Sequence, residues 1–169
     1  MRKIEGCFEE IRGKIPGTNS VDNFHSRGGG DDSLIKFGYE KQKSSLFGVI
    51  FRPVAEIHLK KKGEEKWYRI STIIDSGADV TLLPGMYAGI LGVDLKECKK
   101  QKTRGIGGFA DVYITEMEVR IGSEEMRTFV GFIEGDIPPL MGRTDFFRTF
   151  EVFFKMNEIL FVKGDENEK

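Results

Sequence analysis

The sequence predicts a mostly β fold around one hydrophobic core, and three observations support this. From Phe47 onward, short runs rich in Val, Ile, Phe, Tyr and Thr alternate with glycine, asparagine and charged residues, which is typical of many short strands. The 21 glycines disfavour an all-helical bundle because glycine weakens helices and favours turns. A chain of 169 residues, 39% of them hydrophobic, suffices for one core but is short for two domains.

The first expected elements form a hairpin. Its strands run from about Val49 to Leu59 and from Trp67 to Ile74, and the charged segment 60–65 between them predicts a solvated tip. One helical turn is expected within 86–92, followed by a lysine-rich loop over 96–104.

The second half of the chain predicts four more strands. Apolar residues alternate over 112–121, and a slip in this alternation between Ile114 and Met117 predicts a β-bulge. The remaining strands are expected over 129–133, 150–154 and 159–162, the last two joined by a turn at 155–158.

The chain ends differ in composition from this region. Residues 1–44 lack periodicity and contain Gly28-Gly29-Gly30, so we expect a flexible N-terminal extension. It would be either a linker or disordered arm, or a docking or autoregulatory segment. The folded domain is expected over 45–164, with a polar tail over 165–169.

Charge, cysteine content and hydropathy exclude several classes of function. The formal net charge of −1 provides no basic excess for binding a nucleic-acid backbone. Cys7 and Cys98 are the only cysteines, and we expect two reduced thiols with no metal site and no cofactor. No secretory leader or membrane-length apolar segment is recognisable, so we expect a cytoplasmic protein without a membrane partner.

The strongest local signal for chemistry is the segment Ile73-Ile74-Asp75-Ser76-Gly77-Ala78-Asp79, in which an apolar strand leads directly into a carboxylate. An unpaired charge in a low-dielectric environment costs several kcal/mol, so an acid at the end of a buried strand needs a partner or a function. Gly77 allows the backbone to turn so that its amide approaches the carboxylate. Taken alone, the triplet fits an ordinary Asp-Ser-Gly turn as well as it fits a catalytic site.

Two downstream segments make the catalytic interpretation specific. The first is Arg104-Gly105-Ile106-Gly107-Gly108-Phe109, and the second is Leu140-Met141-Gly142-Arg143. Together and in this order, the three segments resemble the signature, flap and Gly-Arg elements of the retropepsin family of aspartic proteases. The resemblance covers about 47–162 and implies a closed antiparallel β-barrel of the retropepsin-like type with one short helix.

The resemblance also implies how the chain works. Aspartic proteases need two carboxylates that share one proton, and this chain contains a single Asp-Ser-Gly. A homodimer that joins Asp75 of two copies is therefore implied. Viral members build a shared dimer sheet from their termini, and the different termini here leave that interface open and place the chain closer to cellular and prokaryotic relatives.

The remaining site residues are carried over by position. Asp75 would be catalytic, with active-site support from Ser76, Gly77, Gly142 and Arg143. Asp79 either binds substrate or pairs with Arg143 in a purely structural role. The substrate-binding set implied by the resemblance is Gly77, Ala78, Asp79, Val80, Leu82, Gly105, Ile106, Gly107, Gly108 and Leu140.

The function that follows is that of an aspartic endopeptidase acting on peptide or protein substrates, most active at mildly acidic to neutral pH. The alternative is a peptide-binding or assembly module on the same fold that hydrolyses poorly or not at all. His25 and His58 have no partners in the sequence pattern that would make a metal site or a Ser-His triad.

Overall fold

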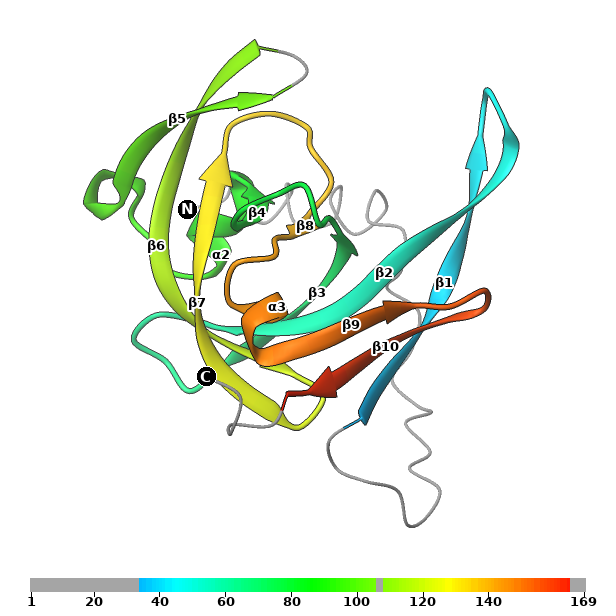
Figure 1. Cartoon of the computed structure of the whole chain (residues 1–169). Helices are drawn as coiled ribbons and strands as arrows, with labels where there is room; N and C mark the ends of the chain where they lie inside the picture. The colour runs from blue at the N-terminus through cyan, green and yellow to red at the C-terminus, as the bar shows by residue number, and fades with distance from the viewer. Residues whose placement is uncertain (1–33, 106–107, 165–169) are drawn as a thin grey trace, which may run out of the picture. The chain divides into compact units, whose positions relative to one another are not determined.

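The computed structural model describes residues 34–105 and 108–164, all of which fall within one compact unit, 31–169. The described residues form ten strands, two short α-helices and one 3₁₀ helix (Figure 1). The elements are β1 (Leu34–Ser44), β2 (Gly48–Lys60), β3 (Trp67–Ile74), β4 (Thr81–Pro84), α2 (Met86–Ile90), η1 (Leu95–Glu97), β5 (Lys99–Gly105), β6 (Gly108–Ile121), β7 (Glu124–Ile133), β8 (Leu140–Met141), α3 (Phe146–Thr149), β9 (Phe150–Phe154) and β10 (Glu158–Lys163).

The strands form one sheet that closes into a ring. Their order is β5-β6-β7-β4-β8-β3-β2-β1-β10-β9. Because β6 also pairs with β2, the six strands from β6 to β2 in this order form a closed ring. Most pairings are antiparallel, but β3 pairs with β8 and β4 pairs with β7 in parallel. The predicted mostly β fold is confirmed, with a mixed sheet and with more than the one short helix expected.

The core is formed by strands of the ring together with β9 and β10, and burial follows the two-residue period of the strands. On β2, Ala55, Ile57 and Leu59 are fully buried, and the residues between them are partly exposed. Phe132 of β7 and Phe161 of β10 are the largest of the fully buried side chains together with Phe146. No helix among the described residues is long and apolar enough to cross a membrane.

Several predicted elements match closely. The second strand of the first hairpin has the predicted bounds Trp67–Ile74, and the strand Phe150–Phe154 does as well. The helical turn is present as α2, and the turn after β9 is closed by the Lys155 amide, which donates to the Glu158 carbonyl at 2.9 Å.

The expectation that residues 1–44 form a flexible extension is wrong for 34–44, which form β1. Ile35, Phe37 and Tyr39 pack against the core, and the Phe37 ring meets Phe161 edge to face at 5.7 Å. Charged residues on the opposite, exposed face of the same strand mask this alternation in the sequence. The rest of that expectation, residues 1–33, lies outside the described residues, as does the predicted polar tail 165–169.

The lysine-rich loop expected over 96–104 is also wrong, because 99–105 form β5, an edge strand paired with β6. Lysine is common on edge strands, where its charge stays in water and opposes pairing with other chains. Lys100 forms an ion pair with Asp111 across the hairpin at 2.8 Å.

The predicted bulge is absent, since β6 pairs with β7 in one unbroken register from Val112 to Ile121. The slip instead marks a change of buried face along β6. Val112 packs over Gly131 of β7, whereas Met117, Val119 and Ile121 face the main core near β2. The segment after Asp79 forms a separate short strand, β4, which pairs with β7 and β8.

Candidate active site

Asp75 follows directly after the last residue of β3, at the parallel pairing with β8. Ile73 and Ile74 lie opposite Leu140 and Met141. The Asp75 amide continues this ladder by donating to the Met141 carbonyl at 3.0 Å, so the backbone of the acid is fixed by the sheet. The residue as a whole is partly exposed, which leaves its carboxylate accessible from outside the core.

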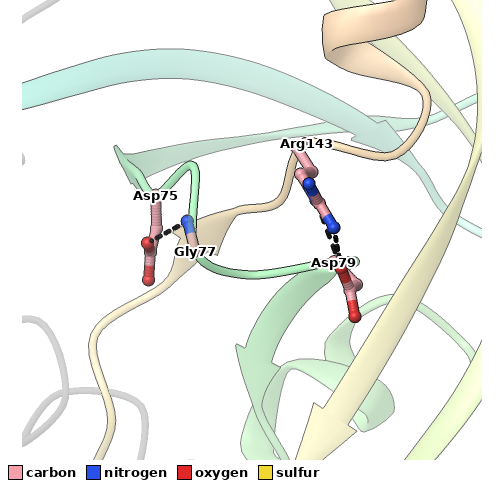
Figure 2. A network of polar contacts seen from close by, with 4 residues as sticks. All are labelled: Asp75, Gly77, Asp79 and Arg143. Atoms are coloured by element: carbon pink, nitrogen blue, oxygen red, sulfur yellow. Dashed lines mark hydrogen bonds and ion pairs between the residues drawn. The ribbon is translucent and has the colours of Figure 1, made fainter.

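The turn after β3 wraps around the Asp75 side chain. The Gly77 amide donates to Asp75 Oδ1 at 2.9 Å (Figure 2), and the Ala78 amide donates to the Asp75 carbonyl at 3.1 Å. A Cβ on Gly77 would lie 3.2 Å from Asp75 Oδ1, so a larger residue would crowd the carboxylate. Ser76 is exposed, and its hydroxyl makes no hydrogen bond to any of the described residues.

Gly142 packs directly beneath this turn. A Cβ at this position would lie 2.2 Å from the Val80 carbonyl carbon, 2.4 Å from the Val80 oxygen and 2.7 Å from the Thr81 nitrogen. The Gly142 amide also donates to the buried Thr81 hydroxyl at 3.3 Å. Only glycine fits this contact without moving the backbone, because the opposing atoms belong to the main chain.

Asp79 and Arg143 join the loop after β3 to the loop after β8. Arg143 donates to Asp79 Oδ1 from its terminal nitrogen at 2.8 Å and from Nε at 3.2 Å (Figure 2). The Arg143 amide donates to the Ala78 carbonyl, and the Thr144 amide to the Asp79 carbonyl, each at 2.9 Å. Both ion-pair side chains are mostly exposed, so the charge pair alone contributes little to stability. Together, the four hydrogen bonds fix the position of the loop 75–80 against the segment 143–144.

Three of the expected pocket residues lie beside this loop. Val80, Leu82 and Leu140 are partly buried, and Leu82 lies opposite Leu140 in the sheet. A Cβ on Gly131 would lie 2.8 Å from the Leu82 side chain, so the absence of a side chain at Gly131 leaves room for Leu82 to pack against the backbone of β7.

The expected flap is the hairpin of β5 and β6, in which Gly105 lies opposite Gly108. Gly108 has a φ of 112°, a backbone conformation that residues other than glycine rarely adopt. Ile106 and Gly107, expected at the tip, lie outside the described residues.

Sequence reasoning missed Asp145, which holds the segment after Arg143 to β7. Its carboxylate accepts hydrogen bonds from the buried Thr128 hydroxyl at 2.7 Å and from the Phe129 amide at 3.0 Å. Asp145 also precedes α3, but its side chain makes no hydrogen bond to the first turn of that helix, so a helix-cap signal would not have revealed the contact with β7.

His58 lies on β2 away from Asp75 and has a structural environment. Burial lowers the pKa of His58, the neighbouring Glu56 carboxylate raises it, and Arg120 and Arg69 lower it further. Its Nδ1 atom is buried without a hydrogen-bond partner among the described residues.

Cys98 is a free thiol, and burial raises its pKa. Cys7 and His25 lie outside the described residues.

A surface hollow of about 360 Å³ lies at the other end of β3 from Asp75. It is lined by charged residues of the hairpin tip 60–65, by 116–118 and by Arg127. An eight-residue strand spans about 26 Å, so this hollow does not belong to the Asp75 site. Among the described residues, no three His, Cys, Asp or Glu side chains are grouped closely enough to hold a metal ion.

Comparison with known proteins identifies the fold. No protein-family model matches the chain, and no curated protein matches it. Among solved structures, the chain is similar to a retropepsin-like aspartic protease from Rickettsia conorii, with a TM-score of 0.50 and 19% sequence identity over 73% of this chain and 98% of that one. The resemblance seen in the three sequence segments is therefore confirmed at the level of structure: this chain has the retropepsin-like fold.

Proposed function

We propose that the chain is an aspartic endopeptidase that is active as a homodimer. The observation that carries the proposal is the Asp75 carboxylate, which is accessible, is fixed through its backbone by the β3–β8 ladder and accepts the Gly77 amide. A carboxylate held in one orientation in this way is suited to transferring a proton, whereas an ordinary turn does not require such an orientation.

In the proposed mechanism, Asp75 of each of two copies meets at a two-fold axis and the pair shares one proton. The ionised carboxylate takes a proton from a water molecule, and that water attacks the peptide carbonyl carbon. The other carboxyl donates its proton to the carbonyl oxygen, which gives a tetrahedral gem-diol. As the C–N bond breaks, the carboxyl that took the water proton donates it to the leaving amine, and one diol hydroxyl returns its proton to the other carboxylate. The Gly77 amide keeps the carboxylate oriented during these transfers.

The proposed substrate is an extended peptide or protein segment that binds as an added strand. The chain offers the Gly77 carbonyl and the Asp79 amide for such pairing, and Val80, Leu82 and Leu140 as apolar walls for alternate side chains. The exposed Ser76 hydroxyl is free to donate across the dyad to the other copy. The β5–β6 hairpin would cover the bound peptide, because flap-like lids exclude water from the reaction.

The test is cleavage of a diverse peptide mixture across pH 4 to 7, with fragments read by mass spectrometry. Asp75→Asn should abolish every cleavage, because an amide neither accepts nor donates the required proton. Asp94→Asn is the matched control, since Asp94 is exposed, caps η1 through the Lys96 amide, and asparagine caps equally well. Cleavage that survives Asp75→Asn, or none from a folded wild-type dimer, would contradict the proposal.

A further inference from the structure

Exposed large apolar side chains are concentrated at the tips of two hairpins. Of the eleven such side chains among the described residues, seven lie at these tips. We define the β1–β2 tip as Leu46, Phe47, Val49 and Phe51, and the β9–β10 tip as Phe153, Phe154 and Met156. Phe47 is 72% exposed and Phe51 is 64% exposed, so neither packs against its own chain.

The β1–β2 tip extends beyond the end of β3 where Asp75 lies. Strand β2 pairs with β3 only as far as Val54, which lies opposite Ile73. The earlier residues of β2 pair with β1 alone and continue past the level of Asp75 as a two-stranded arm. Phe51 and Val49 therefore lie on the part of β2 that runs past the level of Asp75.

The β9–β10 tip reaches the same level of the sheet. Strand β10 begins at Glu158, opposite Gly38 of β1, and the next residue of β1, Tyr39, lies opposite Pro53 of β2. The turn before Glu158 is thus level with Pro53, one residue before the start of the β2–β3 pairing. Figure 1 shows both hairpin tips on the right of the view.

The amount of apolar surface at the tips suits a protein interface. At roughly 150 to 200 Å² for a fully exposed large apolar side chain, the seven residues leave on the order of 700 to 900 Å² in contact with water. A stable protein interface buries about 800 Å² on each partner. Strand β9 also lies at one edge of the sheet, where its outer backbone groups are available for pairing.

We propose that the two tips bind a second copy of this chain and so form the subunit contact that brings the two Asp75 carboxylates together. The proposal rests on the proposed function, because the dyad requires the second copy to approach the Asp75 end of the sheet. A shared contact at this end satisfies the dyad and covers the apolar tips at once. The contact is isologous, so each copy supplies both tips and each substitution acts twice.

The test is sedimentation equilibrium of the full chain over a wide concentration range. Phe47→Ser with Phe51→Ser changes one tip, and Phe153→Ser with Phe154→Ser changes the other. Phe129→Ser on β7 is the matched control, because Phe129 and Phe154 are both 48% exposed. Circular dichroism of each variant verifies that the monomer stays folded, as expected when the replaced side chains contact water.

We expect each tip variant to weaken dimerisation by about 100-fold or more, since buried aromatic side chains dominate interfaces, and the control to stay within about threefold of wild type. Tip variants that dimerise like wild type would overturn the proposal, as would a wild-type chain that cleaves peptides while monomeric. A dimer that depends on the tips but cleaves no peptide would sustain the interface and refute the proposed function instead.

Discussion

Replacing Gly142 by alanine should distort the catalytic turn and destabilise the fold. The added Cβ would lie 2.2 Å from the Val80 carbonyl carbon, whereas ordinary carbon contacts are about 3.5 to 4.0 Å. The opposing atoms are backbone, so relief requires the Val80–Thr81 segment to move by more than about 1 Å. Overpacking of this kind costs about 1 to 3 kcal/mol, and loss of the bond from the Gly142 amide to Thr81 adds about 1 kcal/mol.

The expected result for Gly142→Ala is a Tm lowered by about 4 to 16 °C, because the total cost is about 2 to 4 kcal/mol and each kcal/mol shifts the Tm of a chain of this size by about 2 to 4 °C. Peptide cleavage should fall by about 100-fold, since a 1 Å displacement of a catalytic group has that effect. Gly38→Ala is the control, because a Cβ there meets nothing within 4 Å. Differential scanning calorimetry of both variants at one protein concentration measures the Tm, and the peptide-mixture assay measures cleavage. A Gly142→Ala protein as stable as Gly38→Ala would refute the packing argument.

Three further changes test separate parts of the structure. Asp145→Ala should lower the free energy of unfolding by about 1.5 to 3 kcal/mol in urea titrations, because it leaves the buried Thr128 hydroxyl without its acceptor. Burial lowers the pKa of His58 below its ordinary 6.5, so the unfolded chain binds the extra proton. Stability should therefore be full above pH 6.5 and decline as the pH falls below it, and His58→Gln should lack that part of the decline. Asp79→Asn should change stability by less than about 1 kcal/mol, because its ion pair with Arg143 is exposed, while raising KM for peptides; an unchanged KM would leave Asp79 a structural role only.

Strand patterns predicted most of the fold because the sheet buries one face of each strand. The bounds of β3 and β9 follow from alternation and turn residues alone. The ring closure does not, because the contact of β6 with β2 joins His58 to Arg120 across 62 positions of sequence. Local patterns also failed at β5, where edge exposure allows a lysine-rich composition that reads as a loop.

The candidate site was predictable where its chemistry is local. The amide of Gly77 lies two residues from Asp75, and the short turn brings them together. The fit of Gly142 under Val80 depends on the antiparallel pairing of β4 with β8, which lie far apart in the sequence, so only the resemblance suggested it. Asp145 was missed because its partners, Thr128 and Phe129, lie on β7 and nothing near them in sequence points to a carboxylate.

Mixing wild-type chain with Asp75→Asn chain shows whether one active site uses Asp75 from two copies. After exchange with a ninefold excess of the variant, only about a tenth of wild-type chains would pair with another wild-type chain. We expect peptide cleavage per wild-type chain to fall to about that fraction, while a ninefold excess of an unrelated protein leaves it unchanged. Cleavage per wild-type chain that is unaffected by the Asp75→Asn chain would show that each active site uses Asp75 from one chain only.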